Sequence, residues 1–154
     1  MKALIIALAL LLGSSQAYAN KEVIEACDIA RELAADLVGQ FPLQVDSVTS
    51  LVGMVPMYLA GKCTVLFNYV LDEDAVVNDF IGSVKRESAG RMGITRGEAI
   101  EYMNTLQFRK EFIAYTRKRV SPDLVAMTEL PGVVVKMNYA FDKGNVTQIA
   151  VHLP

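Results

Sequence analysis

The stretch that decides the fold is CTVLFNYVL, Cys63 to Leu71. Its residues alternate as they do on the two faces of a β-strand. One face carries Cys63, Val65, Phe67, Tyr69 and Leu71, and the other carries Thr64, Leu66, Asn68 and Val70. The acidic run Asp72-Glu73-Asp74 follows, and such residues suit the positive N-terminal end of a helix. The stretch therefore predicts a strand that leads directly into a helix.

The residues before this strand predict a helix and a first hairpin. Apolar residues recur at helical spacing over Glu22 to Val38, with Cys27 on the flank of the apolar stripe. Val45 to Val52 is rich in Val, Thr and Ser, which favours a strand. Pro56 interrupts the sequence after it, so we expect Met54 to Leu59 to form a bulged edge or a connection.

The C-terminal residues predict a second hairpin. Val133 to Phe141 alternates along one strand, Asp142 to Asn145 makes the turn, and Val146 to Leu153 returns. Two hairpins imply an antiparallel sheet of about four strands. With an N-terminal helix and a helical middle segment on one face, the fold class is α+β, in a single domain over residues 20–154.

The middle segment holds two apolar stripes that conflict. Thr95 and Glu98 form a capping-box pattern at the start of a helix. One stripe consists of Ala99, Tyr102, Met103, Leu106 and Ile113, and the other of Phe108, Phe112 and Tyr115. A helix break between Asn104 and Gln107 would let both stripes reach the core. A continuous helix would instead present the aromatic stripe to a partner, and we favour the break because basic residues are seldom buried.

The first residues predict an export signal that is removed. Lys2 is followed by an uncharged apolar run, and Ala17-Tyr18-Ala19 has the small-x-small pattern of a cleavage site. We expect residues 1–19 to be a signal peptide cut between Ala19 and Asn20, with an uncleaved anchor as the alternative. The expected location is the periplasm or the outside of the cell. No later apolar stretch approaches the length needed to span a membrane.

The two cysteines, Cys27 and Cys63, predict a disulfide bond. Paired cysteines in an exported chain usually join, because the compartment is oxidising. The alternative is a redox-active pair, but such pairs usually occupy a Cys-x-x-Cys motif and these two are far apart.

Charge is distributed unevenly along the chain. Residues 20–84 hold three basic and ten acidic residues, whereas residues 85–119 hold nine basic and four acidic ones. Such a separation can steer a partner. The candidate partner surface consists of Phe108, Arg109, Lys110, Phe112, Tyr115, Arg117, Lys118 and Arg119. The pI near 5.4 and the export signal argue against nucleic acid, so we expect these basic residues either to form a solvated helix face or to contact an acidic protein partner.

Residues that carry catalysis are scarce. His152 is the single histidine and is expected at the surface near the chain end, and no nucleophile-elbow motif is present. One histidine and a bonded cysteine pair cannot supply a zinc site. We therefore predict no catalytic residue, no metal and no cofactor.

Three functions remain open from the sequence. The first is an exported, non-enzymatic binding or accessory protein of the inhibitor, immunity or assembly type. The second is a carrier of a small apolar ligand between sheet and helices, suggested by the aromatic residues and by Met54, Met57, Met103 and Met137. The third is a hydrolase, since folding could bring two carboxylates together.

Overall fold

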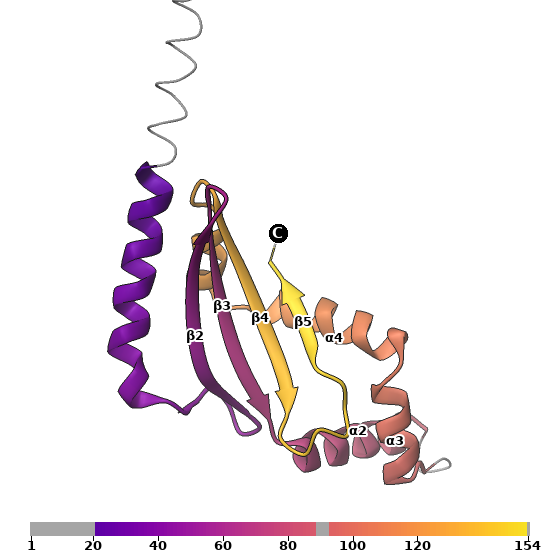
Figure 1. Ribbon diagram of the computed structural model, residues 1–154. Coiled ribbons are helices and arrows are strands. Elements are labelled where there is room, and N and C mark those ends of the chain that lie inside the picture. The colour runs from indigo at the N-terminus through magenta and orange to yellow at the C-terminus, as the bar shows by residue number, and fades with distance from the viewer. Residues whose placement is uncertain (1–20, 89–92, 154) are drawn as a thin grey trace, which may run out of the picture.

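A computed structural model describes residues 21–88 and 93–153 of the chain (Figure 1). The predicted signal peptide and its cleavage site between Ala19 and Asn20 lie outside the described residues. Within these residues the fold is a single α+β domain, as the sequence predicts, built of helices on a sheet of five strands. None of the described helices has the length and apolar character to cross a membrane.

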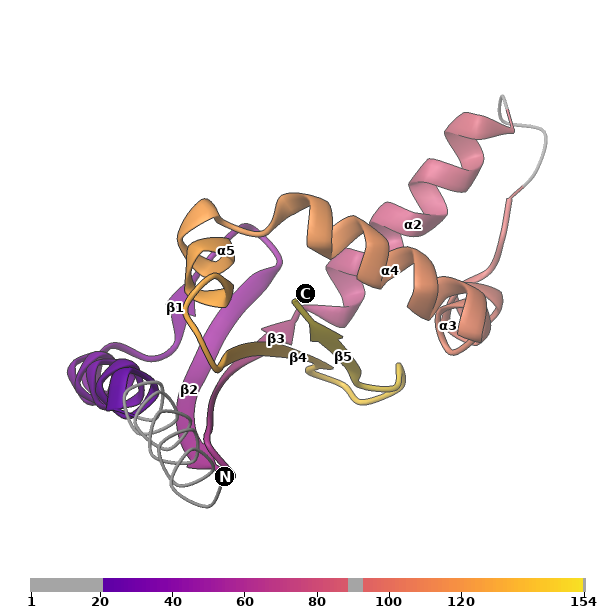
Figure 2. The same ribbon diagram turned by 90° about the horizontal axis from the view of Figure 1, so that it is seen from above.

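The N-terminal helix spans residues 21–37 and continues into a short 3-10 turn, η1 (Val38–Gln40). It lies along strand β2 (Thr49–Leu59) in both ribbon views (Figures 1 and 2). Its buried residues are Val23, Cys27, Ala30 and Ala34, at the helical spacing seen in the sequence. Cys27 and Cys63 form the expected disulfide, with both residues fully buried and their Cα atoms 5.4 Å apart.

The sheet has the order β1-β2-β3-β4-β5, which makes it one strand wider than the sequence predicts. The extra strand is β1 (Leu43–Gln44), whose two residues pair with Ser50 and Leu51. Strands β2 and β3 (Lys62–Leu71) form an antiparallel hairpin. Strands β4 (Val133–Phe141) and β5 (Ile149–His152) are also paired antiparallel. The sequence does not predict β1, because two residues are too few to show an alternating pattern.

The two hairpins are joined through a parallel pair. Strand β4 runs parallel to β3 over its whole length, from Cys63 opposite Val133 to Leu71 opposite Phe141. The sheet is therefore mostly, not wholly, antiparallel. A parallel pair needs a long crossover, and the helical segment between Leu71 and Val133 provides it.

Strand β2 passes through Pro56 without interruption. Its register shifts between Leu51 and Gly53, so the expected irregularity lies before the proline. Pro56 is paired with Val65 and is tolerated because β1 covers only the beginning of β2, which leaves the rest of β2 at the sheet edge. Ala60 and Gly61, both with positive φ, form the two-residue turn to β3.

The crossover contains four helices with the capping residues that the sequence suggests. They are α2 (Glu73–Glu87), α3 (Arg96–Met103), α4 (Leu106–Arg119) and α5 (Pro122–Thr128). Asp72 caps α2, and Thr95 and Glu98 form a complete capping box on α3. The helix breaks at Asn104 and Thr105, where the Thr105 hydroxyl caps α4. The break, favoured over one continuous helix, is confirmed.

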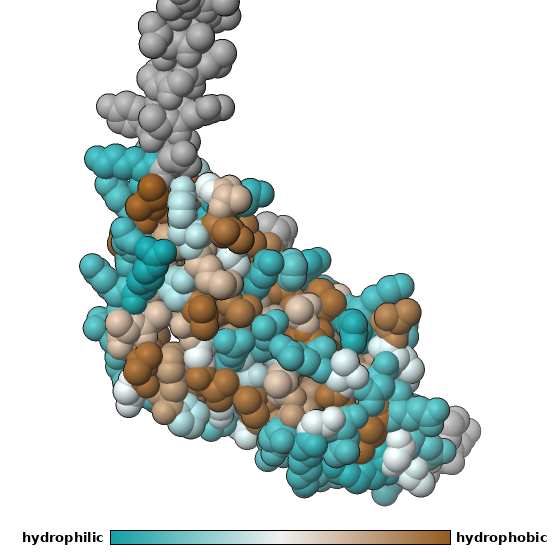
Figure 3. All heavy atoms as spheres, viewed as in Figure 1, coloured by the Kyte–Doolittle hydropathy of each residue, from teal (hydrophilic) through white to brown (hydrophobic). Residues whose placement is uncertain are grey.

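The helices α4 and α5 cover one face of the sheet (Figure 2). On β3 and β4 the covered face holds the buried residues Val65, Phe67, Val135 and Met137, as strand alternation predicts. The opposite face is half-buried and mixed, with an Asn138-to-Asn68 hydrogen bond at its centre. In Figure 3 the hydrophobic side chains over the strands form small patches separated by hydrophilic ones.

The turn between β4 and β5 is wider than the sequence predicts. Val146 to Thr147 do not pair with β4, and β5 begins only at Ile149. The reason is a set of polar contacts to the helices. The backbone N–H of Asn145 donates to the carboxylate of Glu73 at 2.9 Å, and that of Thr147 donates to the Asn104 side chain at 2.8 Å. These two contacts replace the strand pairing in the loop.

Glu73 is fully buried at the start of α2 and holds this loop in place. Its carboxylate accepts hydrogen bonds from the Asn145 backbone and side chain at 2.9 and 2.8 Å. Arg96 supplies an ion pair at 3.2 Å and also contacts Asp74 at 2.7 Å. The acidic run after β3 therefore does more than cap a helix, because its central residue joins α2, α3 and the β4–β5 loop.

Candidate functional site

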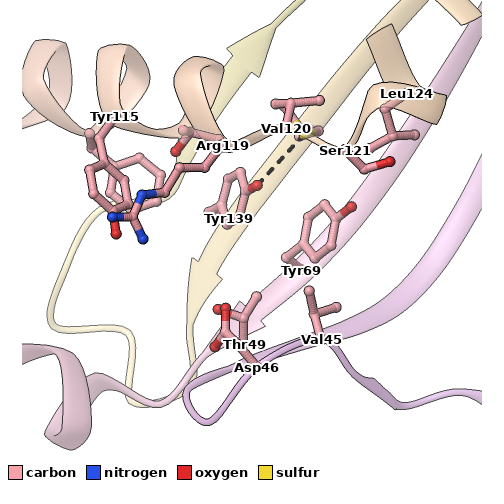
Figure 4. A pocket seen from close by; sticks show the side chains of 13 residues that line it. Val45, Asp46, Thr49, Tyr69, Tyr115, Arg119, Val120, Ser121, Leu124 and Tyr139 are labelled. Atoms are coloured by element: carbon pink, nitrogen blue, oxygen red, sulfur yellow. Dashed lines mark hydrogen bonds between the residues drawn. The ribbon is translucent and has the colours of Figure 1, made fainter. Parts of the chain in front are cut away.

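A hollow of about 300 Å³ lies between the covered face of the sheet and helices α4 and α5. We call it the tyrosine groove, and Figure 4 shows it from close by. Its floor comes from β3 and β4, one wall from α4, one end from α5 and the other wall from the segment between β1 and β2. The lining residues are Val45, Asp46, Thr49, Tyr69, Phe112, Tyr115, Thr116, Arg119, Val120, Ser121, Leu124, Met137 and Tyr139.

Two tyrosines from neighbouring strands form the floor. Tyr69 and Tyr139 are opposite each other in the parallel register, and their rings stack with centroids 4.9 Å apart and planes 11° apart. In Figure 4 both hydroxyl groups point toward the side of the groove where Val120 and Ser121 lie. The Tyr139 hydroxyl donates to the sulfur of Met137, whereas the Tyr69 hydroxyl has no hydrogen-bond partner among residues 21–88 and 93–153.

The environment of these tyrosines keeps them protonated. Burial raises the pKa of Tyr69. Burial also raises the pKa of Tyr139, with further contributions from Tyr69 and from the negative charge of Asp46. Loss of a proton would place a charge in an apolar setting, which is unfavourable. The groove therefore offers two neutral phenols that can donate or accept hydrogen bonds.

We expect this protonation to be visible in a titration. The folded state holds the two phenolic protons above the ordinary tyrosine pKa of about 10, while the unfolded state releases them. Tyrosinate absorbance of the native protein should therefore rise later with pH than that of the urea-unfolded protein. Stability should fall as the pH increases above about 10, and Tyr69→Phe or Tyr139→Phe should reduce that fall. Coincident titrations of native and unfolded protein would contradict this assignment.

The wall on α4 is aromatic. Phe112 meets Tyr139 edge to face with centroids 5.2 Å apart, and it continues to Phe108 at 6.1 Å. Phe108 contacts Phe80 of α2 and Tyr102 of α3, whose rings stack at 5.1 Å. Aromatic pairs prefer these offset and edge-on arrangements. The cluster fixes α4 against α2, α3 and the sheet, and so fixes the width of the groove.

A second, larger hollow adjoins the tyrosine groove. It has a volume of about 670 Å³ and lies between α2, α4 and the segment before β2. Asp46, Phe112 and Tyr115 line both hollows, so the two lie side by side. We call this second one the acidic hollow, and its further lining residues are Ser47, Val48, Ala75, Val76, Asp79, Phe80, Ser83, Met103, Phe108 and Glu111.

The eight residues of the predicted partner surface are divided between two sides of α4. Phe108 and Phe112 are half-buried and line the hollows, together with the more exposed Tyr115. The guanidinium of Arg119 lies over the Tyr115 ring, 4.4 Å from its centroid. The aromatic residues of the predicted surface therefore face the hollows, whereas some of its basic residues lie on the other side of α4.

The basic residues have different surroundings. Arg117 donates two hydrogen bonds, at 3.1 and 2.8 Å, to the backbone carbonyl of His152 in the edge strand β5. Lys110 and Lys118 are exposed, and Arg109 is half-buried. A protein partner on this basic side of α4 remains a prediction.

Of the methionines considered for a pocket, two line the hollows. Met137 lies in the tyrosine groove and Met103 in the acidic hollow. Met54 is part of the core, and Met57 is exposed on β2. The sequence did not suggest several of the groove residues. Two of them, Asp46 and Thr49, precede or begin β2 and are brought close to Tyr139 by the pairing of the strands.

The arrangement is suited to holding a molecule by apolar contact. Among the described residues, no three His, Cys, Asp or Glu side chains are grouped as metal ligands. The His152 side chain is exposed on β5 and belongs to neither hollow. Small-molecule sites are typically concave and mostly apolar with a few placed polar groups. The tyrosine groove has this composition.

Comparisons with known proteins give little further information. No family model and no curated protein matches the chain. Among solved structures, a crystal structure of a presumed secreted protein from Pseudomonas aeruginosa overlaps 84% of this chain and 90% of that chain, with 8% identity and a TM-score of 0.36. This degree of similarity assigns neither fold nor function.

Proposed function

We propose that the protein is an exported, non-enzymatic binding protein that holds a small apolar ligand in the tyrosine groove. The observation that carries the proposal is the stacked pair of Tyr69 and Tyr139 on the floor of a hollow between sheet and helices. The hollow of about 300 Å³ and the neighbouring one of about 670 Å³ both have the usual size of ligand sites. The buried disulfide supports an oxidising compartment.

The aromatic floor and the hydroxyl of Tyr69 indicate how a ligand would be held. A chain or flat apolar group lying across the edges of the two stacked rings would remove apolar surface of the groove from water, which is the main favourable contribution to such binding. The Tyr69 hydroxyl, which lacks a partner within the described part of the chain, can accept or donate one hydrogen bond to the ligand.

A titration of the mature protein with 1-octanol, followed by two-dimensional NMR, tests the proposal. We expect saturable shifts confined to amides around the tyrosine groove. Val45 lines the groove and is 57% exposed, so Val45→Trp should obstruct it without disturbing the core. Excluding two methylenes at about 0.8 kcal/mol each should weaken binding roughly tenfold.

The matched control is Val125→Trp. Val125 lies on α5, is 44% exposed and does not line either hollow. This variant should bind octanol as the parent does. Chemical-shift changes that do not saturate with octanol, or equal octanol affinity of the two tryptophan variants, would show that the tyrosine groove is not the binding site.

A further inference from the structure

We propose that the acidic hollow receives the positively charged end of the ligand, so that the preferred ligand is a small organic cation with an apolar chain. This inference rests on the proposed function, because it assigns the chain to the tyrosine groove. It is carried by the walls and the charges of the acidic hollow, and by the three residues that line both spaces, Asp46, Phe112 and Tyr115.

The walls of the acidic hollow are aromatic. Phe80, Phe108, Phe112 and Tyr115 all line it, and they come from α2 and α4. The ring faces of Phe and Tyr attract ammonium groups, and cages of such rings are the usual way in which proteins recognise alkylated ammonium ions. An anion has no comparable attraction to these faces.

The charges in the acidic hollow have one sign. Asp46, Asp79 and Glu111 line it, and none of the described lining residues is basic. Asp79 has an ion pair with Arg86 at 3.9 Å, in which both side chains are largely exposed, so the pair is weak. Glu111 accepts hydrogen bonds from Tyr102 and Gln107, and these neutral donors leave its charge uncompensated.

The two hollows together set the direction in which a ligand would lie. Arg119 lines only the tyrosine groove and lies over Tyr115, so its positive charge opposes an ammonium group at that end. Asp46 lies at the junction, and its charge reaches Tyr139. The cationic group of a ligand is therefore attracted toward Asp79 and Glu111, while the apolar chain of the same ligand lies over Tyr69 and Tyr139.

Three probes with the same octyl chain separate charge from apolar contact. They are octyltrimethylammonium, 1-octanol and octyl sulfate, each titrated below its micelle concentration and followed by NMR of the mature protein. We expect the ammonium probe to bind roughly tenfold more tightly than octanol, and the sulfate more weakly than octanol. Amides of α2 near Asp79 should shift with the ammonium probe and not with octanol.

Two substitutions test the assigned carboxylates. Asp79→Asn combined with Glu111→Gln should abolish most of the preference for ammonium while leaving octanol binding unchanged. Gln at position 111 can still accept the hydrogen bond from Tyr102. The control is Asp36→Asn, an exposed position on the N-terminal helix, which should leave all three affinities unchanged.

The outcomes distinguish this inference from the proposed function. Equal affinity for all three probes would overturn the cation assignment and leave the tyrosine groove as an apolar site. Absence of binding by every probe would overturn both. Tighter binding of a trilysine peptide than of octyltrimethylammonium, with shifts around Asp79, would overturn the small-molecule assignment in favour of a basic protein segment.

Discussion

Replacing both Cys27 and Cys63 by alanine should lower the free energy of unfolding by about 3 to 4 kcal/mol, since the bond closes a loop with a sequence separation of 36. The bond joins the N-terminal helix to β3, and both residues are fully buried. Domains of this size are stable by only about 5–15 kcal/mol, so the variant should be close to the limit of folding. Urea unfolding of the mature proteins measures the difference.

The control for this prediction is the parent protein in the presence of a strong reductant. Its unfolding midpoint should approach that of the double alanine variant, because both lack the same covalent link. The slope of unfolding free energy against urea should increase in both, since an unlinked unfolded chain exposes more surface. A loss below about 1 kcal/mol in the variant would show that the bond contributes little to the fold.

The second large effect should come from Glu73. Replacing it by glutamine leaves the Arg96 guanidinium without its buried partner and weakens the hydrogen bonds from Asn145. Removing one member of a buried ion pair costs about 3–5 kcal/mol in general. Because the Arg96 side chain is 41% exposed and keeps its ion pair with Asp74, we expect a loss below that range, about 2 kcal/mol. Amide exchange in residues 142–148 should accelerate more than exchange in the strands.

Asp74→Asn provides a matched control on the same turn of α2. Asp74 also pairs with Arg96 and with Lys143, and those contacts hold its pKa below the ordinary value, but its side chain is 46% exposed. Exposed ion pairs contribute little to stability, so this variant should lose much less than Glu73→Gln. Equal losses in the two variants would contradict the anchoring role of Glu73.

Features with local causes could be predicted from the sequence. The alternation over Cys63 to Leu71, the capping box of Thr95 and Glu98, and the break near Asn104 all depend on neighbours within a few residues. The disulfide was also predictable, because two cysteines allow a single pairing. These features sufficed for the α+β class and for one buried face of β3.

Features with distant causes could not be predicted. The parallel register that places Tyr69 beside Tyr139 depends on how the long crossover closes, and no pattern in either strand specifies it. The sequence likewise predicts Glu73 at the start of a helix. Its burial could not be predicted, because it depends on the β4–β5 loop, whose Asn145 donates hydrogen bonds to the Glu73 carboxylate. The stripe of Phe108, Phe112 and Tyr115 was visible, but the groove that it faces forms only after α4 meets the sheet.

The most direct test of the account is a search for intermolecular nuclear Overhauser effects between the aliphatic protons of 1-octanol and the protein. We expect contacts to the ring protons of Tyr69, Tyr139 and Phe112, which form the floor and wall of the tyrosine groove. Contacts instead to Leu66 and Val134 on the opposite face of the sheet, or no contacts at saturating octanol, would contradict it.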